Sequence, residues 1–180
     1  MKHDIKEEIE IPSGIQCEVA ARMLKCKKDA HELSREITST KITVKIEGNK
    51  IIFHCPKGNK AQYKIVMSYL KHIANMFRGL EKKFVYKLQA ANVHFPMTLK
   101  VVGEHLEINN FLGEKVPRKA RILPHVTVEI KGQEITVSSH DKESAGHTVS
   151  NIEKATRIKN RDRRIFQDGI YLVSRPEGNR

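Results

Sequence analysis

Six basic residues crowd into residues 154–164, which read KATRIKNRDRR and include a single acid, Asp162. Four of the six are arginines, whose planar fork of donors suits a phosphate better than the point charge of lysine does. The alternative is a solvated helix end, because cations near a helix C-terminus are mildly stabilising. That effect needs one or two cations and not four arginines. The composition therefore favours phosphate binding.

A second basic stretch, residues 113–124, reads GEKVPRKARILP and contains Lys115, Arg118 and Lys119 beside two prolines. We expect an extended loop here. Basic loops bounded by proline are common on any surface, so this stretch alone is weak. With residues 154–164 in the same half of the chain, it predicts that this half carries most of the binding face.

Candidate catalytic and metal-binding residues are poorly arranged. Residues 138–141, SSHD, contain serine, histidine and aspartate, but neighbours in sequence have the wrong geometry for a catalytic triad. His54 beside Cys55, and the pair His140 and His147, lack the spacing and partners of zinc ligands. The sequence predicts no metal and no cofactor.

A metal-dependent nuclease would need clustered acids within the basic face. Asp162 and Asp168 are the only acids in residues 154–171, and we expect them to orient neighbouring arginines or to cap the turn at Gly169. The shortage of carboxylates argues against an enzyme.

The composition points to an anionic partner. The chain has 180 residues, with 33 basic against 21 acidic and a formal net charge of +12. That surplus favours nucleic acid or a lipid surface. No run approaches the ~20 apolar residues of a membrane span, and no segment joins a basic face to a large apolar one. We therefore expect nucleic acid and no membrane.

Cysteine and aromatic residues refine this expectation. Cys17, Cys26 and Cys55 are an odd number without C-x-x-C spacing, which argues against a disulfide framework and favours a reducing compartment. Tryptophan is absent and aromatics make up 6% of the chain, so few rings are available to stack on nucleic-acid bases. Contacts with RNA would then depend on backbone and shape.

An internal repeat sets the domain organisation. Residues 43–54, TVKIEGNKIIFH, and residues 127–138, TVEIKGQEITVS, are identical at five of twelve positions, with Gly48 aligned to Gly132. Apolar residues alternate with polar ones on both sides of each glycine, which predicts a β-hairpin in each copy. Three charged positions change sign between the copies, as expected of solvent-facing positions.

Each predicted hairpin leads into a predicted helix. Apolar residues at steps of three and four indicate a helix over residues 60–78, with Gly79 as its C-cap. The second helix is expected to begin near Ser144. Short strands are expected within residues 9–28, which hold two of the cysteines, and a hairpin turning at Gly103 is expected within residues 97–108.

These elements predict an α+β fold of two tandem duplicated domains, each a small, mostly antiparallel sheet packed against a helix. We place the first domain at residues 1–86 and the second, with the main binding face, at residues 87–180. Residues 166–173, FQDGIYLV, predict a turn and a closing strand. If that strand joins the sheet, the basic segment before it is an anchored loop.

Several motifs resemble one family. HFPM at 94–97, NNFLGEK at 109–115 and NIEKATRIKNRDRRIFQDGIY at 151–171 resemble the large-subunit ribosomal protein numbered six in the universal naming, whose eukaryotic members are numbered nine. IEIPSGI at 9–15 resembles the opening strand of that family. The likeness covers nearly the whole chain in the archaeal and eukaryotic style, and it is densest in the second half.

The resemblance implies a structural constituent of the cytoplasmic large ribosomal subunit, without catalytic residues. It implies binding of ribosomal RNA near the sarcin–ricin loop and the stalk base, beside other ribosomal proteins and the translation-factor site. The RNA-contact candidates, most of them already singled out by their charge, are Lys115, Arg118, Lys119, Arg157, Lys159, Asn160, Arg161, Arg163, Arg164, Gln167, Asp168, Gly169 and Tyr171.

One stretch departs from the family. A Gly-Pro-x-Gly turn is expected near residues 27–30, but residues 26–33 read CKKDAHEL. This substitution puts RNA contacts of the first domain in doubt and leaves the second domain untouched. The alternative function is a freestanding RNA-binding or RNA-processing protein.

Overall fold

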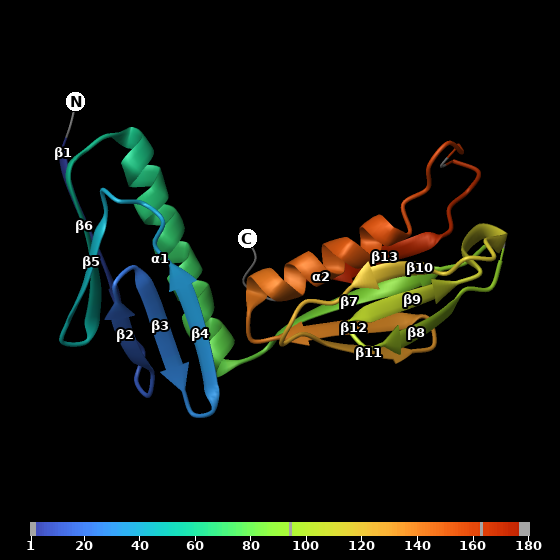
Figure 1. The fold of residues 1–180 in the computed structure, drawn as a ribbon, viewed down its shortest axis with the longest axis horizontal. Helices are drawn as coiled ribbons and strands as arrows, with labels where there is room; N and C mark the ends of the chain where they lie inside the picture. The colour runs from blue at the N-terminus through green and yellow to red at the C-terminus, as the bar shows by residue number, and fades with distance from the viewer. Residues whose placement is uncertain (1–2, 94, 163, 177–180) are drawn as a thin grey trace. The chain divides into compact units, whose positions relative to one another are not determined.

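The computed structural model of the chain describes residues 3–93, 95–162 and 164–176. The chain divides into two compact units, residues 1–82 and 83–180, each with its own core (Figure 1). Both units combine antiparallel sheets with one long helix. The predicted α+β class is confirmed. No helix in the described ranges is both long and apolar enough to cross a membrane.

The two units divide between Lys82 and Lys83, whereas the sequence placed the division after residue 86. The reason is the strand Phe84–Ala91, which belongs entirely to the second unit. Its alternate residues, beginning with Phe84 and Tyr86, are buried in the second core.

Two three-stranded sheets and a helix make up the first unit. Leu24, Ile51 and Phe53 are fully buried between the sheets and the helix. One sheet has the order β1-β6-β5, from β1 (His3–Glu10), β6 (Lys50–Gly58) and β5 (Thr43–Glu47). The other has the order β2-β3-β4, from β2 (Gln16–Ala20), β3 (Met23–Lys28) and β4 (His31–Glu36).

The hairpin that lacks the family's glycines still forms a tight turn. β3 and β4 pair from Lys28 opposite His31 onwards. Asp29 in the turn has φ 51°, in the left-handed region that aspartate tolerates better than most residues.

The second unit contains a four-stranded and a three-stranded sheet. Leu88, Leu106, Phe111, Ile135 and Ile152 are fully buried among these sheets and the helix. The first sheet has the order β11-β12-β7-β13, from β11 (Thr127–Lys131), β12 (Glu134–Ser139), β7 (Phe84–Ala91) and β13 (Gly169–Ser174). The second has the order β10-β9-β8, from β10 (Arg118–Arg121), β9 (His105–Asn109) and β8 (Thr98–Val102), and a short 3-10 turn, η1 (Phe111–Gly113), follows β9.

The repeated sequences form the same hairpin twice, as predicted. Gly48 and Gly132 both have positive φ, 60° and 62°, in two-residue turns. Ile46 pairs with Ile51 in β5 and β6, and Ile130 pairs with Ile135 in β11 and β12. The identical register places the same apolar positions on the core side of both sheets. The hairpin turning at Gly103 also forms, between β8 and β9.

The first helix, α1 (Lys60–Glu81), is longer than predicted. Asn59 caps it: its side chain accepts from the N–H groups of Ala61 and Gln62. The expectation that Gly79 is the C-cap is wrong, because Gly79 lies buried inside the helix. The helix continues because Leu80 packs into the core.

The second helix, α2 (Lys142–Ala155), begins slightly earlier than predicted. The Asp141 carboxylate caps it by accepting from the N–H groups of Glu143 and Ser144. An aspartate at this position also suits the positive end of the helix dipole. Its apolar residues Val149 and Ile152 are buried.

Residues 113–124 are only in part the extended loop that the sequence predicts. Arg118–Arg121 forms β10, which pairs with β9. Ala120 lies opposite Leu106 and is buried, because alternation brings it into the second core.

Candidate nucleic-acid interface

The basic run ends in a loop that is held at both ends, as the sequence predicts. Residues 156–168 connect α2 to β13, which pairs with β7 in the four-stranded sheet. Buried Thr156 accepts a hydrogen bond at its Oγ1 from the N–H of Ile170, at 3.0 Å. The Glu153 carboxylate accepts from the N–H of Leu172, at 3.1 Å. The end of the helix and the start of the strand are thus joined directly.

Asp162 organises the middle of this loop. Its carboxylate accepts from the N–H of Arg164, at 2.9 Å, and its carbonyl accepts from the N–H groups of Ile165 and Phe166. The guanidinium of Arg161 lies over the Phe166 ring, 4.8 Å from its centroid. The acid expected to orient neighbouring arginines therefore fixes the turn that carries them.

Asp168 connects the loop to another segment. Its buried carboxylate accepts from the N–H of Val93, at 2.8 Å. Near the same place the Phe95 ring lies beside Gly113, and the Asn110 side chain donates to the carbonyl of Pro96, at 3.1 Å. The segments 92–97, 110–117 and 156–168 therefore meet at one end of the second unit. We call these three segments, with β10, the basic tip.

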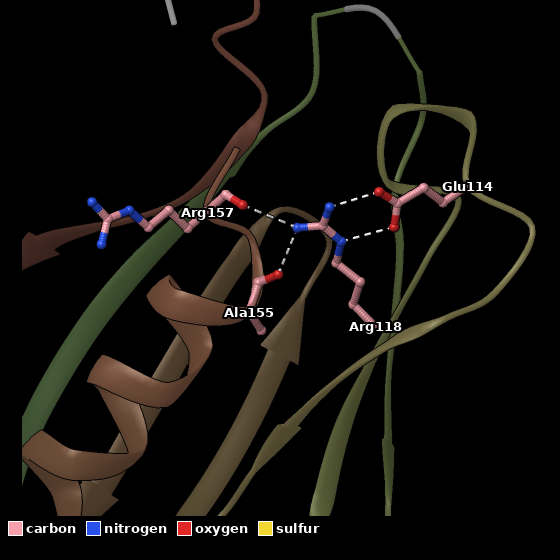
Figure 2. A network of polar contacts seen from close by, with 4 residues as sticks. All are labelled: Glu114, Arg118, Ala155 and Arg157. Atoms are coloured by element: carbon pink, nitrogen blue, oxygen red, sulfur yellow. Dashed lines mark hydrogen bonds and ion pairs between the residues drawn. The ribbon is translucent and has the colours of Figure 1, made fainter. Parts of the chain in front are cut away.

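Arg118 ties β10 to the end of α2 (Figure 2). Its Nε and Nη2 donate to the two carboxylate oxygens of Glu114, at 2.8 and 2.6 Å. Its Nη1 donates to the carbonyls of Ala155, at 2.9 Å, and Arg157, at 3.2 Å. The guanidinium also lies 4.3 Å from the centroid of the buried Phe111 ring.

All three nitrogen atoms of the Arg118 guanidinium donate hydrogen bonds within the chain, four bonds in total. The side chain is 25% exposed. Its hydrogen bonds to Glu114 hold the pKa of that carboxyl below the usual range. Arg118, a predicted RNA contact, therefore positions the loop that follows α2, and little of its charge is offered to solvent.

The predicted site residues fall into two groups. One group, of cations, amides and one tyrosine, is exposed to solvent, and the remaining described residues hold the tip together. The exposed group in the described residues is Lys115, Lys119, Arg157, Lys159, Asn160, Arg161, Arg164, Gln167 and Tyr171. Arg163 lies outside the described residues. Lys119 also forms an ion pair with Glu107, whose carboxylate lies 3.1 Å from the lysine Nζ.

Two backbone positions shape the exposed group. Asn160 has φ 56°, in the left-handed region that asparagine tolerates. At Gly169 an added Cβ would lie 3.0 Å from the Tyr171 ring, so glycine lets that ring pack against the backbone. The Tyr171 hydroxyl donates to the carbonyl of Gln167, at 3.1 Å. Asp168 and Gly169, which are among the predicted RNA contacts, are buried beneath these neighbours and help to place them.

A pocket of about 190 Å³ opens beside the loop. Arg157 and Tyr171 line it from opposite ends of the loop, and Thr156 and Ile170 form part of its wall. A cation and an aromatic ring beside one cavity can together hold a phosphate or a sugar with an adjacent base.

The exposed side chains of the tip have the chemistry of a polyanion site. Across the described ranges, no group of three or more histidine, cysteine or acidic residues could hold a metal ion. The sequence missed Thr156, Phe111 and Glu114 as positioning residues. The spacing of Glu114 and Arg118, four residues apart with opposite charges, was the available signal for that pair.

The fold and the site define a protein of two α+β units with a cationic loop tip on the second. A family model described as "Ribosomal protein L6" matches residues 95–169, which include nearly all of that tip. The large ribosomal subunit protein uL6 of Methanococcus vannielii is 43% identical over 171 residues, 95% of this chain and 94% of the relative. The uL6 of Methanospirillum hungatei is 43% identical over 173 residues, 96% of this chain and 98% of the relative.

The chain belongs to the ribosomal protein L6 family. The predicted family membership is confirmed over nearly the full length of the chain.

Proposed function

We propose that this protein is a structural, non-catalytic constituent of the cytoplasmic large ribosomal subunit that binds ribosomal RNA with the basic tip of its second unit. The relatives named above are large-subunit proteins, and they match this chain almost from end to end. The binding place, from the family resemblance, is near the sarcin–ricin loop and the stalk base. There the protein would support the region where translation factors bind, beside neighbouring ribosomal proteins.

The proposal rests on a difference between the arginines of the tip: one is bonded within the chain and others are exposed. Arg118 spends its donors on Glu114 and on two backbone carbonyls, while Arg157, Arg161 and Arg164 remain exposed. A loop held at both ends presents its cations without the full entropic cost of ordering a free tail. It can therefore neutralise phosphates of RNA helices that otherwise repel, at positions set by the fold.

Hydroxyl-radical footprinting of the large-subunit rRNA, with and without the full-length protein, tests the place of binding. We expect protection of the sarcin–ricin loop and of the stalk base. Protection confined to other rRNA regions would contradict this place. In cell extracts, sedimentation of the protein only in ribosome-free fractions would favour the freestanding alternative.

A pair of variants tests the surface. Arg161→Gln with Arg164→Gln should reduce the dependence of log K on log salt by about two units and weaken rRNA binding by about tenfold or more. Lys100→Gln with Lys131→Gln is the matched control, since both lysines are exposed on strands of the same unit outside the tip. Equal losses in the two pairs would show that only net charge matters and would contradict a specific tip.

A further inference from the structure

The first unit carries a second cationic surface, on the outer side of α1. The helix contains four Lys or Arg residues and a single acid, Glu81. The four, which we call the α1 stripe, are Lys60, Lys64, Lys71 and Arg78, and all are exposed. Their steps of four, seven and seven residues place them within about 40° of one another around a helix of 3.6 residues per turn.

The α1 stripe lies directly opposite the buried side of the helix. Val66, Tyr69, Ile73 and Leu80 face the core of the first unit. At 100° per residue their mean direction is about 180° from that of the stripe. The stripe therefore points away from its own unit along nearly the whole length of α1, which Figure 1 shows lying along the sheets.

None of the four cations forms an ion pair within the part of the chain that the structure describes. A solvated helix face usually mixes charges of both signs at four-residue spacing, because such pairs stabilise the helix. Here Lys60 and Lys64 are like charges at that spacing. The stripe is thus a surface of one sign.

Helix stability explains Arg78, which lies in the last turn near the negative end of the helix dipole, but not the lysines of the stripe. Lys60 is the first residue of α1 and Lys64 is one turn further, near the positive end of the helix dipole, where cations are unfavourable. No acid lies in the first turn of α1. The helix of the second unit differs: α2 begins with Asp141 as its cap and Glu143 in its first turn.

We propose that the α1 stripe binds the phosphate backbone of an RNA duplex, as a second RNA-contacting surface independent of the basic tip. On the rigid helix, Lys64, Lys71 and Arg78 repeat every ~10.5 Å (seven residues at 1.5 Å each), and Lys60 lies ~6 Å before Lys64, so the four cations form a straight row that can face a row of backbone phosphates. A-form RNA is recognised largely through its backbone and shape, which such a row reads without base contacts. An acidic protein would offer charge without that regular spacing.

Lysine footprinting on the full-length native protein tests the proposal. The protein is acetylated briefly with and without a 16-bp RNA duplex of mixed sequence, and modified lysines are measured by mass spectrometry. We expect RNA to protect Lys64 and Lys71 and to leave Lys27 and Lys45 reactive; these two are exposed on strands of the same unit. Equal reactivity of Lys64 and Lys71 with and without RNA would overturn the proposal.

Charge variants give a second, independent measurement. Lys64→Gln, Lys71→Gln and Arg78→Gln together should lower the salt dependence of duplex binding by about three units. Lys27→Gln, Lys41→Gln and Lys45→Gln remove the same charge from exposed positions of the same unit. Glutamine is a good helix former, so α1 should persist, and circular dichroism checks this.

The outcomes separate this surface from the tip. If the stripe triple binds the duplex as the native chain does, while Arg161→Gln with Arg164→Gln weakens binding, the stripe inference fails and the tip proposal stands. If the stripe and control triples lose duplex binding equally, net charge alone explains the loss and the inference is overturned. Polyglutamate serves as a probe for an acidic protein partner. If the stripe triple binds the RNA duplex as the native chain does but no longer binds polyglutamate, the inference is overturned in favour of such a partner.

Discussion

Arg118 and Glu114 face each other through two parallel hydrogen bonds, of 2.8 and 2.6 Å, in the second unit. The two residues are one helical turn apart in sequence, but the chain between them is not a helix. Their pairing closes the segment after η1 and turns the remaining donors of Arg118 towards the end of α2 (Figure 2). A short-range ion pair thereby fixes a long-range contact.

Arg118→Lys should destabilise the protein although the positive charge remains. A lysine cannot reproduce the bidentate geometry and also reach the carbonyls of Ala155 and Arg157, because it lacks the planar fork. We expect a loss of about 1–3 kcal/mol in the free energy of unfolding, measured by urea denaturation. Lys119→Arg, which also keeps the charge on the neighbouring exposed residue, is the control and should change stability little. Equal stability of Arg118→Lys and the native chain would contradict the tethering role.

The same pair makes stability depend on acid. Hydrogen bonding to Arg118 lowers the pKa of Glu114 in the folded state from its ordinary value of 4.5. The stability from this group is therefore fully present above about pH 4.5 and is lost as the pH falls through the lowered folded pKa. Because both side chains are partly exposed, the effect is small.

Thermal unfolding scans at several pH values check this dependence. Glu114→Gln should be less stable than the native chain at pH 7, and the difference should shrink below pH 4.5. A constant difference across that range would contradict the assigned protonation behaviour.

Asp168 should be required for the order of two loops. Asp168→Ala removes the buried acceptor of the Val93 N–H, and we expect it to cost about 1–3 kcal/mol of stability. Asp168→Asn retains an oxygen that can accept from the same N–H and should cost less. Hydrogen exchange at the Val93 amide is the direct measurement, with faster exchange expected in the alanine variant. Unchanged protection there would show that the contact does not persist in solution.

The two cysteines of the β2–β3 hairpin should differ in reactivity. Cys17 and Cys26 lie opposite each other in register, and their thiols interact. The hydrogen bond with Cys26 lowers the pKa of Cys17, whereas the same bond and burial raise the pKa of Cys26. Cys17 is half-buried and Cys26 is fully buried.

Alkylation with iodoacetamide at pH 8 should therefore modify Cys17 well before Cys26, because the thiolate is the nucleophile. Peptide mass spectrometry over time checks the order. Cys17→Ser serves as the control: Cys26 should remain slow in that variant. Faster modification of Cys26 than of Cys17 in the native chain would contradict the assignment.

Local sequence patterns determined the elements of this protein. The repeated TV-x-I-x-G segments predicted both hairpins and their turns, because alternation and a glycine at positive φ are properties of the neighbouring residues alone. The helix ends were less well predicted. At Gly79 the burial of Leu80, a tertiary contact, outweighed the local preference of glycine for a C-cap.

The sequence also located the basic tip by its density of arginines, since charge composition needs no fold to be read. It could not divide that tip into residues that face solvent and residues that hold the loop. The Arg118 side chain contacts a carbonyl 37 positions away, and Asp168 contacts an N–H 75 positions away. Only the packing of β10, α2 and β13 in one core brings such partners within hydrogen-bonding distance. The residue types were therefore set by the sequence, and the tertiary structure decided which charges remain exposed.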